Sequence, residues 1–196
     1  MDAKTYFNRL NCLLSETQVT EGQGLPIDID AAVDKVISLL QPLSGQPPKV
    51  MAVGNGGSAA IVSHLVNDLC KALGVRAMTF TELPLLTAFA NDLSYQDAYE
   101  KHVELFADCG DVLWAVSSSG CSQSILKAVS AARAAHCSIV TFSGFAQGNP
   151  LRSIGDINFY IPSSVYGLVE VAHTALCHYI TDHALHCLDV YRKAKT

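Results

Sequence analysis

The sequence has little charge and no long apolar run. Only 16% of its 196 residues are Asp, Glu, Lys or Arg, whereas 49% are hydrophobic, which excludes an intrinsically disordered chain. No uncharged apolar stretch approaches the roughly 18–20 residues of a membrane span, so we expect no membrane partner. The first residues, MDAKTYFNRLNCLL, carry charges where a signal peptide needs its apolar core, and they predict no secretory signal.

Basic charge and cysteine motifs are also scarce. Thirteen Lys and Arg residues stand against eighteen Asp and Glu residues, giving a net charge of −5, and no basic stripe is present. This balance argues against direct nucleic-acid binding. The seven cysteines lack CxxC spacing, so the sequence predicts no disulfide framework but reduced, mostly buried thiols in a cytoplasmic protein: Cys12, Cys70, Cys109, Cys121, Cys137, Cys177 and Cys187.

What the sequence does contain is a regular alternation of short apolar runs and helical patterns. The runs cover residues 50–53, 77–80, 112–116, 139–142 and 157–161. The helical patterns cover 1–17, about 29–40, 58–73, 84–106 with a break near Asn91 and Asp92, 122–135 and 165–190; polar or Pro-rich breaks cover 16–26 and 42–48. Continuous apolar strands separated by helices predict a mostly parallel sheet covered on both faces, in a single α/β domain with two leading helices.

A glycine-rich turn follows the first apolar run. Its sequence is Gly54, Asn55, Gly56, Gly57 and Ser58, directly before a predicted helix. Glycine lets the backbone approach a ligand closely, and a helix N-terminus attracts anions. The turn has neither the Gly-Lys-Ser/Thr of a nucleotide loop nor the GxGxxG of a dinucleotide site. Taken alone, it is equally consistent with a purely structural turn.

A serine-rich turn follows the third apolar run: Ser117, Ser118, Ser119, Gly120, Cys121 and Ser122. Four hydroxyl groups around a glycine at a helix N-terminus suit the oxygens of a phosphate, although a Ser-rich capping loop is the alternative. Ligands of open parallel sheets bind outside the carboxyl ends of the strands, so the two turns together favour one binding site.

Two helices carry ionisable side chains at spacings that allow a shared site. His64 and Asp68 lie one turn apart on the predicted helix 58–73. Glu170 and His178 are eight residues apart on the last helix, with an angular offset of about 80°, so they can converge. Each histidine could instead be a core residue. His173 and Cys177 form a competing pair, for which we favour packing.

The motifs GNGGSAA, His64, Asn91–Asp92 and GDVLWAVSSSGCSQSILKAVSAAR resemble the sugar isomerase (SIS) domain family, and most closely its phosphoheptose isomerases. The resemblance implies a flavodoxin-like three-layer sandwich with a five-stranded parallel sheet and N-terminal helices. It also implies one SIS domain over residues 1–196. Residues 1–45 would serve oligomerisation in a homotetramer with active sites between subunits.

The same resemblance implies a set of site residues. Phosphate would be held by the serine turn, through Ser117, Ser118, Ser119 and Ser122. The sugar would be lined by Asn55, Gly56, Gly57, Ser58, Asn91 and Asp92. Asp68 would be the catalytic base and His178 the acid, and zinc would be held by His64, Asp68, Glu170 and His178.

Several positions depart from the family pattern. Asp68 stands where the family has Glu, and Glu170 where it has Gln. Two carboxylates and two imidazoles remain acceptable zinc ligands. The turn before the last helix reads Tyr166, Gly167, Leu168, where the family usually has an acidic residue and Arg, and Ala72 replaces an Arg that often follows the base.

Three functions are compatible with these residues. The first is isomerisation of sedoheptulose 7-phosphate to D-glycero-D-manno-heptose 7-phosphate through an enediol, for the heptose of bacterial lipopolysaccharide. The second is a non-catalytic tetramer that binds a replication initiator. The third, a sugar-phosphate-sensing regulator, lacks an accompanying DNA-binding segment. The ionisable residues at all four positions of the quartet favour the enzyme.

Overall fold

The computed structural model describes residues 2–22, 24–41 and 47–193, and the side chains up to residue 187. Most of the break expected over residues 42–48 therefore lies outside the described residues. The strands are β1 (Gln18–Glu21), β2 (Leu25–Pro26), β3 (Lys49–Gly54), β4 (Arg76–Thr79), β5 (Val112–Ser117), β6 (Ser138–Ser143) and β7 (Ile157–Tyr160). The helices are α1 (Ala3–Ser15), α2 (Ile29–Leu39), α3 (Gly57–Lys71), α4 (Leu83–Asp92), α5 (Tyr95–Phe106), α6 (Gln123–Ala134) and α7 (Tyr166–Lys193), with a 3-10 turn over Pro150–Ser153.

The five predicted strands are confirmed, and they pair in parallel in the order β4-β3-β5-β6-β7. Numbered in chain order, this is 2-1-3-4-5, the flavodoxin-like order, whose ligand sites lie where the winding reverses. Here the reversal falls between β3 and β5. The prediction of a five-stranded sheet was wrong in number, because the described chain forms a sheet of seven strands.

The two additional strands come from the segment expected to be a polar break. β1 pairs antiparallel with β7, and β2 pairs antiparallel with β1 at the sheet edge. β1 has four residues and β2 only two, and both residues of β2 are exposed. Strands this short carry too little alternation to be recognised in the sequence. Their pairing depends on the free edge of β7, against which Val19 is buried.

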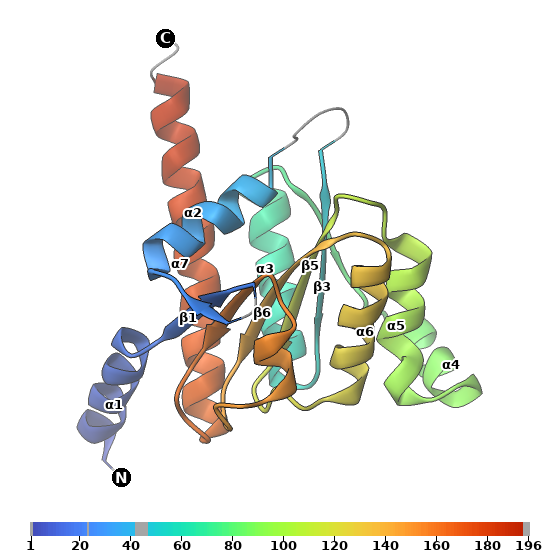
Figure 1. The fold of residues 1–196 in the computed structure, drawn as a ribbon, viewed down its shortest axis with the longest axis horizontal. Helices are drawn as coiled ribbons and strands as arrows, with labels where there is room; N and C mark the ends of the chain where they lie inside the picture. Colours follow the sequence, from blue (N-terminus) through green and yellow to red (C-terminus); the bar gives the residue numbers. More distant parts are fainter. Residues whose placement is uncertain (1, 23, 42–46, 194–196) are drawn as a thin grey trace.

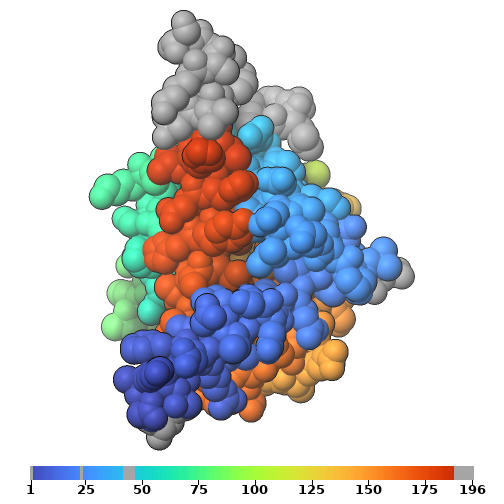
Figure 2. All heavy atoms as spheres, turned by 90° about the vertical axis from the view of Figure 1, so that its left-hand side faces the viewer, coloured from blue at the N-terminus to red at the C-terminus, as the bar shows by residue number. Residues whose placement is uncertain are grey.

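Helices cover both faces of the sheet, as the continuous apolar strands predicted (Figure 1). Val50, Ala52 and Trp114 belong to the core shared with α2, α3 and α7, whereas Met51 and Leu113 face α5 and α6. Alternate strand residues therefore fill opposite layers. Figure 2 shows α7 on the molecular surface between α2 and α3.

The predicted break near Asn91 and Asp92 is confirmed. α4 ends at Asp92, and α5 begins three residues later at Tyr95, with Ser94 at the N-cap position. No residue of α4 is buried, although the helix is apolar in composition. No helix of the described residues is long and apolar enough to cross a membrane.

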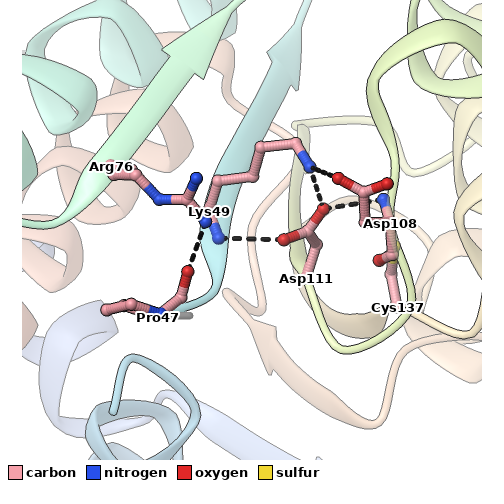
Figure 3. Close-up of polar contacts among 6 residues, drawn as sticks. All are labelled: Pro47, Lys49, Arg76, Asp108, Asp111 and Cys137. Carbon is pink, nitrogen blue, oxygen red and sulfur yellow. Dashed lines mark hydrogen bonds and ion pairs between the residues drawn. The ribbon is translucent and has the colours of Figure 1, made fainter. Parts of the chain in front are cut away.

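An ion-pair cluster ties the amino ends of β3 and β5 together (Figure 3). The Lys49 ammonium pairs with Asp108 at 2.6 Å and with the buried carboxylate of Asp111. Asp111 also accepts hydrogen bonds from the backbone N–H groups of Lys49 (2.9 Å) and Asp108 (2.7 Å). This end of the sheet lies opposite the carboxyl ends of the strands, so we assign the cluster a structural role.

The cysteines are free thiols, as predicted, but the expectation that most are buried was wrong. Cys137 and Cys177 are buried, and the other five are exposed. The exposed ones lie on outward helix faces or in turns, positions that a cysteine count does not reveal. Burial raises the pKa of the Cys137 thiol to about 11 and that of Cys177 to about 12.

Candidate functional site

The glycine turn and the serine turn meet at one pocket. β3 ends at Gly54 and β5 at Ser117, and the two strands are hydrogen-bonded neighbours. The pocket has a volume of about 230 Å³ and is lined by Asn55, Gly56, Gly57, Ser58, Ser117, Ser118, Ser119, Ser122, Tyr166 and Glu170. We call it the serine pocket. It lies where the sheet order reverses, the place at which doubly wound folds bind ligands.

The polar groups of the serine pocket are only partly satisfied within the chain. Ser117 Oγ donates to Ser122 Oγ at 3.3 Å, and the Cys121 N–H donates to Ser119 Oγ at 3.3 Å. Ser118 is 4% exposed, and its Oγ has no hydrogen-bond partner among the described residues. A buried hydroxyl without a partner costs free energy unless a ligand or water completes it. This geometry suits an oxygen-rich ligand.

The first turn of α3 opens onto the same pocket. Its N-cap residue is Gly56, with φ 53°, a backbone conformation that favours glycine. Among the residues that the structure describes, no side chain hydrogen-bonds as a cap there. The helix therefore presents backbone N–H groups and the positive end of its dipole to the pocket, which favours an anion.

Two residues that the sequence reasoning missed hold Asn55 in place. The Tyr95 hydroxyl donates to Asn55 Oδ1 at 2.6 Å, and Asn55 Nδ2 donates to Ser124 Oγ at 3.0 Å. Tyr95 begins α5 and Ser124 lies in the first turn of α6. Each lies at the start of a helix, but no pattern in the sequence pairs either residue with Asn55.

Asn91 and Asp92 do not line the serine pocket within the described residues of this chain, so their role in binding the sugar stays a prediction. They end α4, are exposed, and bond to each other through Asn91 Nδ2 and Asp92 Oδ1 at 2.9 Å. The break in the helix turns the chain after them, and Tyr95 supplies the contact with Asn55 instead.

A second polar site lies farther along α3 and α7. The Asp68 carboxylate is 3.2 Å from His178 Nδ1 and 3.7 Å from His64 Nε2. The two imidazole rings meet edge to face, with centroids 4.8 Å apart. One ligand atom from each of the three residues lies within 4.8 Å of the others. We call His64, Asp68 and His178 the histidine–aspartate cluster.

The composition of this cluster fits zinc. Two imidazoles and one carboxylate form a three-ligand set that leaves a coordination position open, the arrangement of catalytic zinc sites. The side chains of His64 and His178 are 57% and 40% exposed, so a ligand can reach them. The structure thus places three of the four predicted zinc ligands, His64, Asp68 and His178, in one cluster.

Glu170 is the fourth proposed ligand, and the structure places it elsewhere. Its carboxylate lines the serine pocket and lies against Gly57, where a Cβ atom would overlap with it. The reason is helix geometry: eight residues separate Glu170 from His178, which is about 12 Å along α7. The expected zinc quartet is thus reduced to the histidine–aspartate cluster in this chain.

The two sites are aligned by the packing of α3 beside α7 (Figures 1 and 2). Gly57 faces Glu170 at the serine pocket, and Asp68 faces His178 at the cluster. Gly57 and His64 are seven positions apart, which corresponds to about 10 Å along α3. A single elongated ligand can therefore extend from one site toward the other.

Two other residues of α7, His173 and Cys177, pack in the core. His173 is fully buried, and its Nε2 donates to the backbone carbonyl of Ser143 at 3.1 Å. Burial lowers the pKa of His173 to about 4, which keeps the ring neutral. Cys177 is buried one turn further on. The prediction that this pair packs in the core is confirmed.

Tyr166 also lines the serine pocket, in the turn where the sequence departs from the expected pattern. Its ring stacks at a tilt on Phe145, with centroids 4.7 Å apart, and it is 58% exposed. An aromatic ring therefore stands at the pocket mouth, in place of the charged pair expected there.

The fold and the pocket define a protein class, and comparison with known families gives the same one. Residues 5–144 match the model of the SIS domain family, so the chain belongs to this family. The phosphoheptose isomerase of Shewanella denitrificans is 31% identical over 176 residues, which cover 86% of this chain and 88% of the relative. The chain is an isomerase.

Solved structures support the fold assignment. The phosphoheptose isomerase GmhA of Neisseria gonorrhoeae superimposes with a TM-score of 0.78 at 24% identity, covering 92% of this chain and 95% of that one. A phosphoheptose isomerase of Francisella tularensis gives a TM-score of 0.77 at 20% identity, covering 93% and 96%. These similarities establish the same three-layer α/β architecture.

Proposed function

We propose that the protein is a sugar-phosphate aldose–ketose isomerase that converts sedoheptulose 7-phosphate to D-glycero-D-manno-heptose 7-phosphate. The observation that carries the proposal is the arrangement of two sites along α3. The serine pocket, lined by hydroxyl groups, lies at the N-terminus of the helix, and the histidine–aspartate cluster lies about 10 Å farther along it. The relatives named phosphoheptose isomerase supply the substrate class.

The serine pocket would hold the phosphate without Lys or Arg. Its lining offers the hydroxyls of Ser118, Ser119 and Ser122 and the backbone of the first turn of α3. The phosphate would give Ser118 Oγ the partner that it lacks among the described residues. Neutral donors fixed by the fold need no reorganisation to bind a phosphate, and they anchor one end of the substrate.

The histidine–aspartate cluster would perform the proton transfer. In the ketose-to-aldose direction, the Asp68 carboxylate takes a proton from C1, giving an enediol, and the same proton returns at C2. His178 exchanges protons with the two substrate oxygens, so that O2 gains the proton that O1 loses. The 3.2 Å contact between Asp68 and His178 Nδ1 orients the imidazole for this exchange.

Zinc held by His64, Asp68 and His178 would polarise the substrate oxygens when bound. Asp68 is then shared between metal binding and proton transfer, as expected from the sequence. His64, at the solvent side of the cluster, would orient the same oxygens.

The spacing of the two sites favours a long sugar. A sugar phosphate of seven carbons carries its phosphate and its carbonyl at opposite ends, so it extends from the serine pocket toward the cluster. A triose phosphate anchored in the same pocket would leave its carbonyl beside Glu170, short of Asp68. The product would supply heptose for surface lipopolysaccharide.

A homotetramer is the assembly that we infer for this function. α4 has no buried residue, and Leu83, Leu85 and Leu93 are 69%, 44% and 53% exposed. On α1, Phe7 is 65% exposed. Apolar side chains on such helices are commonly covered by a partner chain. The leading helices of residues 1–45 and α4 would then form subunit contacts.

The test is direct turnover. Wild-type protein is incubated with sedoheptulose 7-phosphate and aldose formation is followed by NMR, beside Asp68→Asn and His178→Ala. We expect both variants to lose at least about 100-fold in kcat/KM, the range of general acid–base catalysis. Wild type no faster than the variants would refute catalysis and favour the non-catalytic binding module.

Metal analysis tests the zinc assignment separately. Protein purified without chelator and without a nickel column is expected to carry one zinc per chain, and His64→Ala is expected to carry much less. Equal metal content in the two proteins would contradict the assignment of the cluster as the metal site.

A further inference from the structure

Glu170 occupies an unusual position for a carboxylate. It reaches from α7 to the first residue of α3, and its carboxyl group fills the space that Gly57 leaves by having no side chain. The same carboxyl group lines the serine pocket. An acidic side chain therefore stands inside the site that the rest of the lining prepares for an anion.

Glu170 dominates the charge of this pocket. The other lining residues are glycines, serines, Asn55 and Tyr166, so Glu170 is the one formally charged side chain among the lining residues that the structure describes. α3 has no acidic residue in its first turn and no side-chain cap. A carboxylate beside this helix end interacts favourably with the helix dipole. In the ligand-free chain, Glu170 thus takes part of the electrostatic role of a bound anion.

Ser118 indicates that the pocket also receives a ligand from outside the chain. Ser118 is one of the pocket-lining residues, and its buried Oγ is left without a partner among the described residues, Glu170 included. Glu170 consequently does not complete the site: it complements the helix end but leaves the serine turn unsatisfied.

We propose that Glu170 is a specificity-determining residue, which makes the pocket select phosphates that carry hydroxyl groups over phosphate alone. A bare phosphate brings negative charge close to a fixed carboxylate, and the repulsion weakens its binding. A polyol phosphate brings hydroxyl groups that donate to the Glu170 carboxylate, and such charge-assisted hydrogen bonds are strong. Selectivity then arises both from the repulsion between Glu170 and a bare phosphate and from the hydrogen bonds between Glu170 and the hydroxyl groups of a polyol phosphate.

This inference rests on the proposed function for the assignment of the serine pocket to phosphate, but it concerns binding and not turnover. Glu170 lies about 12 Å along α7 from His178, so removing its charge leaves the histidine–aspartate cluster in place. Binding and catalysis can therefore be measured independently.

The experiment is calorimetric titration with two probes, inorganic phosphate and glucitol 6-phosphate, a polyol phosphate that has no carbonyl and cannot be isomerised. The proteins are wild type, Glu170→Gln, and Glu82→Gln as the control. Glu82 is exposed at the start of α4 and is absent from the pocket lining. The control makes the same change in net charge.

We expect Glu170→Gln to bind inorganic phosphate about tenfold more tightly than wild type. We also expect its preference for glucitol 6-phosphate over phosphate to fall severalfold. Glu82→Gln should match wild type with both probes. Unchanged or weaker phosphate binding by Glu170→Gln, with an unchanged preference, overturns the proposal.

A second variant and a turnover assay separate the role of Glu170 from the proposed reaction. If Glu170→Gln does not fold, as judged by circular dichroism, Glu170→Ala removes the same charge and is titrated in its place. If wild type does not isomerise sedoheptulose 7-phosphate but Glu170→Gln still binds phosphate more tightly, the proposed reaction is refuted and the selectivity role of Glu170 is supported. Normal turnover without the gain in affinity refutes only the role of Glu170.

Discussion

Replacing Tyr95 with Phe removes a single hydroxyl group that positions Asn55 in the serine pocket. The hydroxyl donates to Asn55 Oδ1 at 2.6 Å, and the remaining side-chain bond of Asn55 runs from Nδ2 to Ser124 at 3.0 Å. Without Tyr95, the amide keeps one of its two anchors and its oxygen is free to rotate away. The substrate then meets a less well ordered Asn55.

The size of the effect follows from these contacts. Tyr95 is 47% exposed, so water replaces much of the lost hydrogen bond, and the net value of such a bond is about 1 kcal/mol. We expect the free energy of unfolding to fall by no more than this amount. The same 1 kcal/mol, lost from the oriented site, lowers kcat/KM for sedoheptulose 7-phosphate by about fivefold.

Tyr179→Phe is a matched control, because the Tyr179 hydroxyl also donates to an exposed acceptor, the carboxylate of Asp30. That contact joins α7 to α2 and does not involve the serine pocket. Steady-state kinetics of both variants, with urea unfolding alongside, separates positioning from stability. Equal kcat/KM in Tyr95→Phe and wild type would refute the reasoning, and so would an equal loss in both variants.

Two further predictions concern stability. The pKa of His173 is lowered to about 4 by burial, so between about pH 6.5 and pH 4 the unfolded state binds more protons than the folded state, and stability falls as pH decreases through that window. Wild type should lose up to about 3 kcal/mol of unfolding free energy across this pH window. Urea titrations at several pH values should show a weaker pH dependence of stability for His173→Leu. The control variant His186→Gln, at an exposed histidine, should keep the pH dependence of wild type. Lys49→Met leaves the buried Asp111 carboxylate with only its backbone donors, and we expect a loss of about 3 kcal/mol. Lys101→Met, which breaks an exposed pair, should cost less than about 1 kcal/mol, and similar unfolding midpoints for the two lysine variants would contradict this account.

The sheet was largely predictable because its central strands are buried on both faces. Continuous apolar runs such as 112–116 leave few alternatives to a parallel strand, and all five runs pair as expected. The hairpin of β1 and β2 was not predictable in this way. Its strands have only four and two residues, and they are ordered by pairing with the edge of β7, more than a hundred residues away.

The serine pocket was predictable for a topological reason. Turns that follow neighbouring parallel strands must meet at one edge of the sheet, so the residues after Gly54 and Ser117 were bound to be close once β3 and β5 paired. The contacts of Tyr95 and Ser124 with Asn55 depend on how the next helices begin. Sequence spacing does not contain that information.

By itself, the sequence determined the five parallel strands, the helices and the two ligand turns, because local residue patterns reflect burial and turn chemistry. Only the tertiary structure decided how the ionisable residues are distributed between the serine pocket and the histidine–aspartate cluster. α3 packs beside α7 in one register, which joins Asp68 to His178 and sends Glu170 to Gly57. Helical spacing fixes which residues share a face, but the register between two helices is set by how their side chains pack.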